Sequence, residues 1–105
     1  MDICYYNSQL KDELDGAFDY VKKAILIKKD HPIWADLYKK MSLAELDHAA
    51  TIMKIFEEDY KAVLATEQNN GNTPVYLNDA RKSIIDMYTE FSSKVNYLHD
   101  VYSKT

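Results

Sequence analysis

Residues that interrupt helices are scarce in this 105-residue sequence, which contains two glycines and two prolines. Their scarcity favours long helices joined by short connections. The hydrophobic share of 47% and the charged share of 29% are those of an ordinary globular protein, and the length allows one domain, residues 1–105. We therefore predict a single all-α domain, and the composition excludes an all-β fold.

Cysteines and long apolar runs are also lacking. Cys4 is the single cysteine, which excludes an intrachain disulfide and a thiolate cluster for zinc or iron–sulfur ligation. The longest aliphatic run, residues 24–27, is far shorter than the roughly 20 residues of a membrane helix. The first nine residues lack the basic and apolar regions of a secretory signal. A cytoplasmic protein with no membrane segment is the expectation.

Positive charge is in deficit, with a formal net charge of −4 and a pI near 5.3. Nucleic-acid backbones and anionic membrane surfaces are bound by basic patches, so neither is an expected partner. A cationic partner matches this charge better.

The first two helices are predicted to form an antiparallel hairpin. Helix one begins near Ser8 as N-cap and ends around residues 28–32, where Pro32 opens helix two. Helix two continues to about residue 65 and is broken by the stretch at 67–74. The turn between the helices is short, so helix two must run back along helix one.

A third long helix follows, with Thr73 as its N-cap and Pro74 as its first residue, and it reaches the chain end. Each helix carries an apolar stripe at helical spacing. The stripes are Leu10, Leu14, Ala17, Val21 and Ile25 in helix one; Leu37, Met41, Ala44, His48, Ile52 and Ile55 in helix two; and Leu77, Ala80, Ile84, Tyr88, Phe91, Val95, Leu98 and Tyr102 in helix three.

A possible helix start inside helix two has to be weighed. Ser42 and Glu45 have the Ser-x-x-Glu spacing of a capping box, which is typical of a helix N-terminus. The apolar stripe crosses this point in register, from Leu37 through Met41 to Ala44. We therefore predict one continuous helix.

Three polar side chains are predicted to meet in the hairpin. Glu45 and His48 are three residues apart and share a helix face. Both helices rise about 1.5 Å per residue, and the turn lies midway between Glu13 and these two residues, so all three lie at one height. Two carboxylates and an imidazole suit iron or manganese and can also take zinc. The small neighbours that would leave room for an ion are Gly16, Ala17, Ala44, Ala49 and Ala50.

Two motifs carry a resemblance to a known family. The segment ELDGAFDY (13–20) resembles the first-helix signature of ferritin-like di-iron proteins, and the Glu-x-x-His at 45–48 resembles their second-helix motif. A full ferritin-like chain has two such helix pairs, whereas this chain has one, which resembles the half-ferritins of the encapsulated ferritin family. The resemblance implies a homodimer that forms a four-helix bundle, with Glu13, Glu45 and His48 of each chain at a shared di-iron site.

The resemblance also implies a function and further residues. It implies a ferroxidase that oxidises Fe²⁺ for iron storage or detoxification, with manganese or zinc as substitute metals and Tyr20 beside the ligands. The C-terminal residues do not look like the tail that directs such proteins into an encapsulin-type shell, so a shell and the free cytosol both stay open. Apart from the resemblance, His99 lies near the height of the site and could support its ligands if helix three packs against the hairpin; otherwise it belongs to an exposed helix end. Asp12 and Asp15 are either solvated surface charges or residues that attract incoming Fe²⁺.

The same residues also allow a non-catalytic interpretation. Glu-x-x-His pairs arise by chance, and Glu13 lies next to Asp12 and Asp15 in what could be a solvated acidic turn. On this reading the chain is a helical oligomerisation or structural protein without bound metal.

Overall fold

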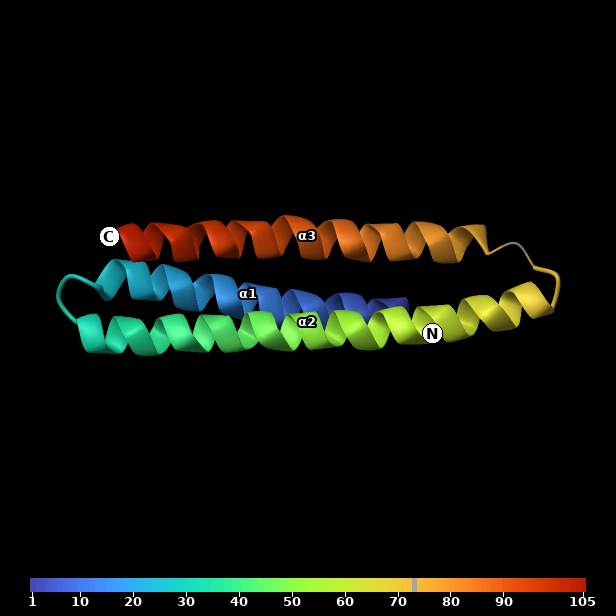
Figure 1. Cartoon of the computed structure of the whole chain (residues 1–105), viewed down its shortest axis with the longest axis horizontal. Helices are drawn as coiled ribbons and strands as arrows, with labels where there is room; N and C mark the ends of the chain where they lie inside the picture. Colours follow the sequence, from blue (N-terminus) through green and yellow to red (C-terminus); the bar gives the residue numbers. More distant parts are fainter. Residues whose placement is uncertain (73) are drawn as a thin grey trace.

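The computed structural model describes residues 1–72 and 74–105, and these residues form an all-helical bundle without strands. Helices α1 (Ile3–Ile27), α2 (Pro32–Asn69) and α3 (Val75–Lys104) lie side by side in a rod 61 Å long and 17 Å across (Figure 1). The α1–α2 turn and the C-terminus share one end of the rod. The predicted hairpin and long third helix are therefore confirmed. None of the described helices has the length and apolarity needed to cross a membrane.

Two helix ends differ from the sequence prediction. α1 begins at Ile3 rather than near Ser8, because the Asp2 side chain accepts a hydrogen bond from the Tyr5 N–H at 3.0 Å and caps the helix earlier. α2 continues to Asn69, a few residues past the predicted end, and stops where Gly71 takes a φ of +78°.

The end of α2 is a Schellman motif. The Gly71 N–H donates to the Gln68 carbonyl and the Asn72 N–H donates to the Glu67 carbonyl, both at 3.0 Å. Glycine adopts the left-handed conformation that this motif requires at little cost. The predicted break after α2 is therefore confirmed and has a physical cause.

The start of α3 is shifted by one residue from the prediction. Pro74 occupies the N-cap position and α3 begins at Val75, so Pro74 is not the first helical residue. The predicted capping role of Thr73 lies outside the described residues. At the other junction Pro32 does open α2, as the sequence predicts.

The core consists of two connected clusters along the seam of the three helices. The predicted stripes of α1 and α3 supply most of it, and Leu46 and Phe91 touch both clusters. Near the α1–α2 turn the buried residues are mostly small, which lets the helices approach closely. The buried members are Ala17, Val21, Ala24, Ala35, Val95 and Tyr102 in the cluster near the turn, and Leu10, Leu14, Ala49, Phe56 and Ile84 in the other.

Most of the predicted apolar stripe of α2 stays outside this core, and Ile52 is the member that packs against it. Leu37 and Ile55 are each 54% exposed and Met41 is 44% exposed. The buried residues of α2 recur instead every seven positions, a period typical of a tight helix seam. They are Ala35, Ser42, Ala49 and Phe56, followed by Tyr60.

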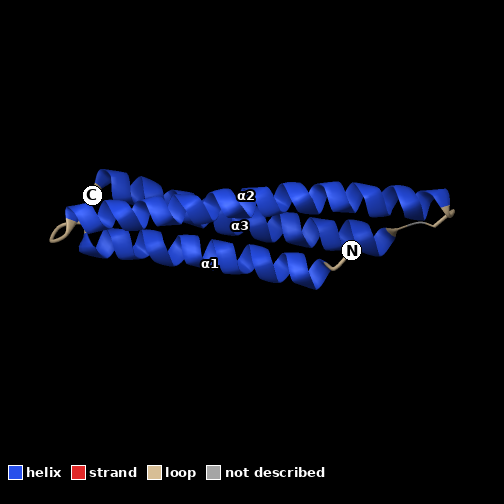
Figure 2. Ribbon diagram, turned by 90° about the horizontal axis from the view of Figure 1, so that it is seen from below, coloured by secondary structure: helices blue, strands red, loops and turns tan. Residues whose placement is uncertain are grey.

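α3 packs mainly against α1 and is tied to the hairpin by polar contacts near its two ends. At its N-terminal end Arg81 places two guanidinium nitrogens 3.1 Å from one Glu57 oxygen. At its C-terminal end the Lys28 ammonium donates to the Tyr102 carbonyl. The two views in Figures 1 and 2 show α3 running alongside the hairpin over most of its length.

Candidate metal site

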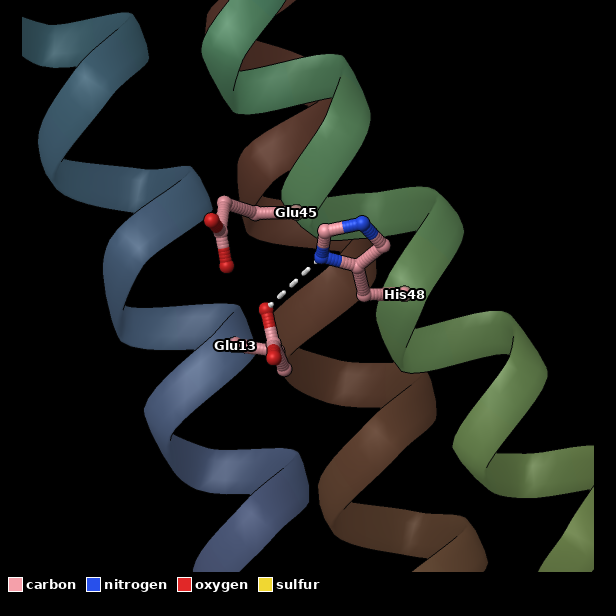
Figure 3. Close-up of side chains that lie close together, drawn as sticks. All are labelled: Glu13, Glu45 and His48. Atoms are coloured by element: carbon pink, nitrogen blue, oxygen red, sulfur yellow. Dashed lines mark ion pairs between the residues drawn. The ribbon is translucent and has the colours of Figure 1, made fainter.

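Glu13, Glu45 and His48 meet at the seam between α1 and α2. One donor atom from each side chain lies within 4.8 Å of the other two, and His48 Nδ1 is 3.4 Å from Glu13 Oε2. Figure 3 shows the three side chains converging in front of the seam, with α3 passing behind it. The predicted equal height of these residues is therefore confirmed, and the site faces away from α3.

The two carboxyl groups are close enough to perturb each other. Hydrogen bonding to Glu13 raises the pKa of the Glu45 carboxyl, and burial and the Glu13 charge raise it further, while the nearby His48 acts in the opposite direction. Glu13 Oε2 is buried and has no hydrogen-bond partner among the described residues. A carboxylate oxygen in this position is expected to gain from a bound cation.

Gly16 provides space beside the cluster. A Cβ built at this position would lie 3.5 Å from Glu45 Oε2, so the Glu45 carboxylate rests on the bare backbone of α1. Larger side chains at position 16 would occupy the space beside this carboxylate. The sequence prediction that a small residue at Gly16 makes room for the site is consistent with this packing.

The cluster is open to one side. The Glu13 side chain is 27% exposed and the His48 side chain is 60% exposed. Two carboxylates and one imidazole fit Fe²⁺, Mn²⁺ or Zn²⁺, and these three side chains leave coordination positions free on a six-coordinate ion. The arrangement can therefore hold a divalent cation only with further ligands from water or from another chain.

The remaining predicted site residues lie outside this cluster. The Tyr20 ring packs against Tyr38, with 6.1 Å between ring centroids. Asp12 is exposed and Asp15 is half-buried. His99 is near the predicted height but points to Ser42, with its Nε2 2.8 Å from Ser42 Oγ. The structure thus brings together Glu13, Glu45 and His48, and the roles of Tyr20, Asp12 and Asp15 stay predictions.

Ser42 lies next to the candidate site, and the sequence analysis gave it no role there. Its side chain is fully buried, and its hydroxyl lies 2.6 Å from the Ala17 carbonyl oxygen of α1. The hydroxyl caps no helix, because α2 is continuous through this position. The seven-residue spacing of the small residues Ala35, Ser42 and Ala49 was the signal that could have placed Ser42 in the core.

Comparison with protein-family models, with curated proteins and with solved structures finds no match to this chain. The resemblance to half-ferritins therefore rests on the two sequence motifs alone. A helical bundle with a Glu/His cluster is what the structure establishes by itself.

Proposed function

We propose that this chain binds iron through Glu13, Glu45 and His48 and oxidises Fe²⁺ to Fe³⁺ as a ferroxidase. The observation that carries the proposal is the cluster itself, in which donor atoms from α1 and α2 lie within 4.8 Å of one another. The Oε2 atom of Glu13 is buried without a hydrogen bond, and its nearest charged group is His48 Nδ1 at 3.4 Å, so a bound cation would add to its stabilisation. The resemblance of both motifs to half-ferritins supports iron as the metal.

A second copy of the chain is the proposed source of the missing ligands. In helical spacing His48 continues a line of exposed apolar residues on α2, the outer stripe Trp34, Leu37, Met41 and Ile55. Trp34, Leu37 and Met41 also line a shallow hollow of about 270 Å³. An exposed apolar stripe marks an interaction surface, and this one is continuous with the candidate site.

A two-fold contact through this face would bring two clusters together. The contact would be isologous, with the same residues contributed by both chains. Four carboxylates and two imidazoles would then face two divalent ions, so that the carboxylate charges neutralise the metal charges. α3 lies behind the α1–α2 seam and leaves this face free (Figure 3). The predicted four-helix bundle of two hairpins follows as part of the proposal.

The residues of the chain would contribute position and charge. Fe²⁺ is the substrate and gives up one electron, which dioxygen or peroxide accepts. Glu13 and Glu45 provide hard oxygen ligands that favour the ferric product, and the exposed imidazole of His48 supplies a nitrogen ligand. Gly16, which has no side chain, leaves room for the Glu45 carboxylate against α1. Product iron would serve storage or detoxification.

A non-catalytic assembly protein is the second candidate, and the outer stripe is the observation that favours it. Exposed Trp34, Leu37 and Met41 would support dimerisation whether or not metal binds. On this account His48 and Glu13 form a boundary ion pair, which at such exposure contributes little to stability.

Oxidation of Fe²⁺ in air tests the proposed activity. The protein is expected to speed the appearance of ferric absorbance well above the buffer rate, and Glu45→Ala should reduce the rate to near that of buffer because it removes a ligand. Glu58→Ala is the matched control, since Glu58 is an exposed carboxylate of the same helix. A parent rate equal to buffer, or an active Glu45→Ala variant, would contradict the proposal.

A further inference from the structure

Ser42 joins all three helices through one hydroxyl group. It is the only fully buried polar residue among those described, with 0% exposure. Its Oγ lies 2.6 Å from the Ala17 carbonyl oxygen of α1 and 2.8 Å from His99 Nε2 of α3. These distances are those of well-formed hydrogen bonds.

The protons in this contact can be assigned by counting. A serine hydroxyl has one hydrogen, and the Ala17 carbonyl can only accept, so the hydroxyl donates to Ala17. The second contact therefore requires that His99 Nε2–H donates to Ser42 Oγ. Burial, and to a smaller extent the Lys39 charge, lower the pKa of His99 and favour the neutral ring. The contact with Ser42 then places the hydrogen of that neutral ring on Nε2.

Ser42 behaves differently from the other serine and threonine hydroxyls whose bonds are defined. The others bond back to a carbonyl three or four residues earlier in their own helix, as Thr51 does to Asp47. The same alternative exists for Ser42, whose fourth preceding residue is Tyr38. The His99 N–H occupies one side of Ser42 Oγ and thereby favours the rotamer that reaches across to α1. The hydroxyls that bond back are Thr51, Thr66, Ser92, Ser93, Ser103 and Thr105.

This cross-helix bond lies beside the candidate metal site. Ala17 follows Gly16, against which the Glu45 carboxylate lies, and Ser42 precedes Glu45 by one helical turn. The bond therefore links the same two turns of α1 and α2 that hold the carboxylates. Metal sites bind tightly only when their ligands are held close to the required geometry by supporting contacts.

We propose that Ser42 and His99 are positioning residues that fix the α1–α2 spacing at the metal site, so that α3 supports the site without contributing a ligand. The inference rests on the proposed metal binding. It extends that function by assigning a role to the third helix and to a hydrogen bond behind the ligands.

Equilibrium binding of Co²⁺ tests the proposal, because this ion takes the same ligands as Fe²⁺ and is not oxidised by air during the measurement. Ser42→Ala keeps the small volume and removes the hydroxyl, so its Co²⁺ affinity is expected to fall at least about tenfold. His99→Leu should weaken binding similarly. His99→Gln, which retains an N–H donor, should bind more tightly than His99→Leu. Ser93→Ala is the control, because the Ser93 hydroxyl is exposed and bonds within its own helix.

The two mutations should also be coupled. In a Ser42→Ala background, His99→Leu should cause little further loss of Co²⁺ affinity, because the shared bond is already absent. Circular dichroism must show each variant folded at the assay temperature. A Ser42→Ala protein that is less stable but binds Co²⁺ with the parent affinity would overturn the positioning role alone. A parent protein that binds no Co²⁺ would overturn the proposed function and this inference with it.

Discussion

Leu37→Asp is expected to yield a folded monomer, whereas we propose that the parent is a dimer. Leu37 is 54% exposed in the isolated chain, so a charge there should not disrupt the core of the monomer. In the proposed dimer the substitution removes apolar contact and buries a carboxylate in both copies. The combined loss is at least about 3 kcal/mol, or roughly a hundredfold in the dimer dissociation constant.

Sedimentation equilibrium and the midpoint of monomer unfolding measure the two effects separately. Leu26→Asp is the matched control, because Leu26 is 78% exposed and helical spacing places it on the far side of α1 from Glu13. This variant should remain dimeric. A Leu37→Asp protein that stays dimeric, or a parent that is monomeric with metal bound, would contradict the proposed interface.

Metal is expected to stabilise the assembled protein by about 2.7 kcal/mol when free metal exceeds its Kd a hundredfold, since the ion binds the native form only. Urea unfolding at fixed protein concentration, with and without Co²⁺, measures this shift. Glu45→Ala should abolish it and Glu58→Ala should not. An equal shift in Glu45→Ala would show that the stabilising ion binds elsewhere.

The same stabilisation should depend on pH in a defined direction. Because the pKa of Glu45 is raised in the folded protein, the folded metal-free protein keeps a proton that the unfolded chain has already lost in the carboxylate range. It therefore loses stability as pH rises through that range. Metal must displace this proton, so metal binding strengthens over the same range. The difference between metal-loaded and metal-free stability should therefore widen as pH increases, and a difference that narrows would be inconsistent with carboxylate ligation.

Much of the fold could be predicted because its signals are local. Pro32 and Gly71 mark the ends of helices by their backbone geometry, and the stripes of α1 and α3 follow the helical period. The meeting of Glu13 with Glu45 and His48 was also predictable, because two antiparallel helices of equal rise joined by a short turn fix which residues share a height.

The α2 core could not be read from hydrophobicity alone. Leu37 and Met41 are larger and more apolar than Ala35 and Ser42, yet the smaller residues are the ones buried against α1 and α3. The role of Ser42 depends on His99, a residue of another helix, and such a partner is visible only in three dimensions. The capping-box spacing of Ser42 and Glu45 is typical of a helix start, but α2 is continuous through this position.

Metal content of the protein purified from iron-replete medium tests the central claim most directly. Two chains that share two ions predict about one iron per chain, removed by a chelator and reduced strongly in Glu45→Ala but not in Glu58→Ala. A protein that is free of transition metal, fully folded, dimeric and unaffected by chelators would contradict the metal site and would favour the non-catalytic assembly protein.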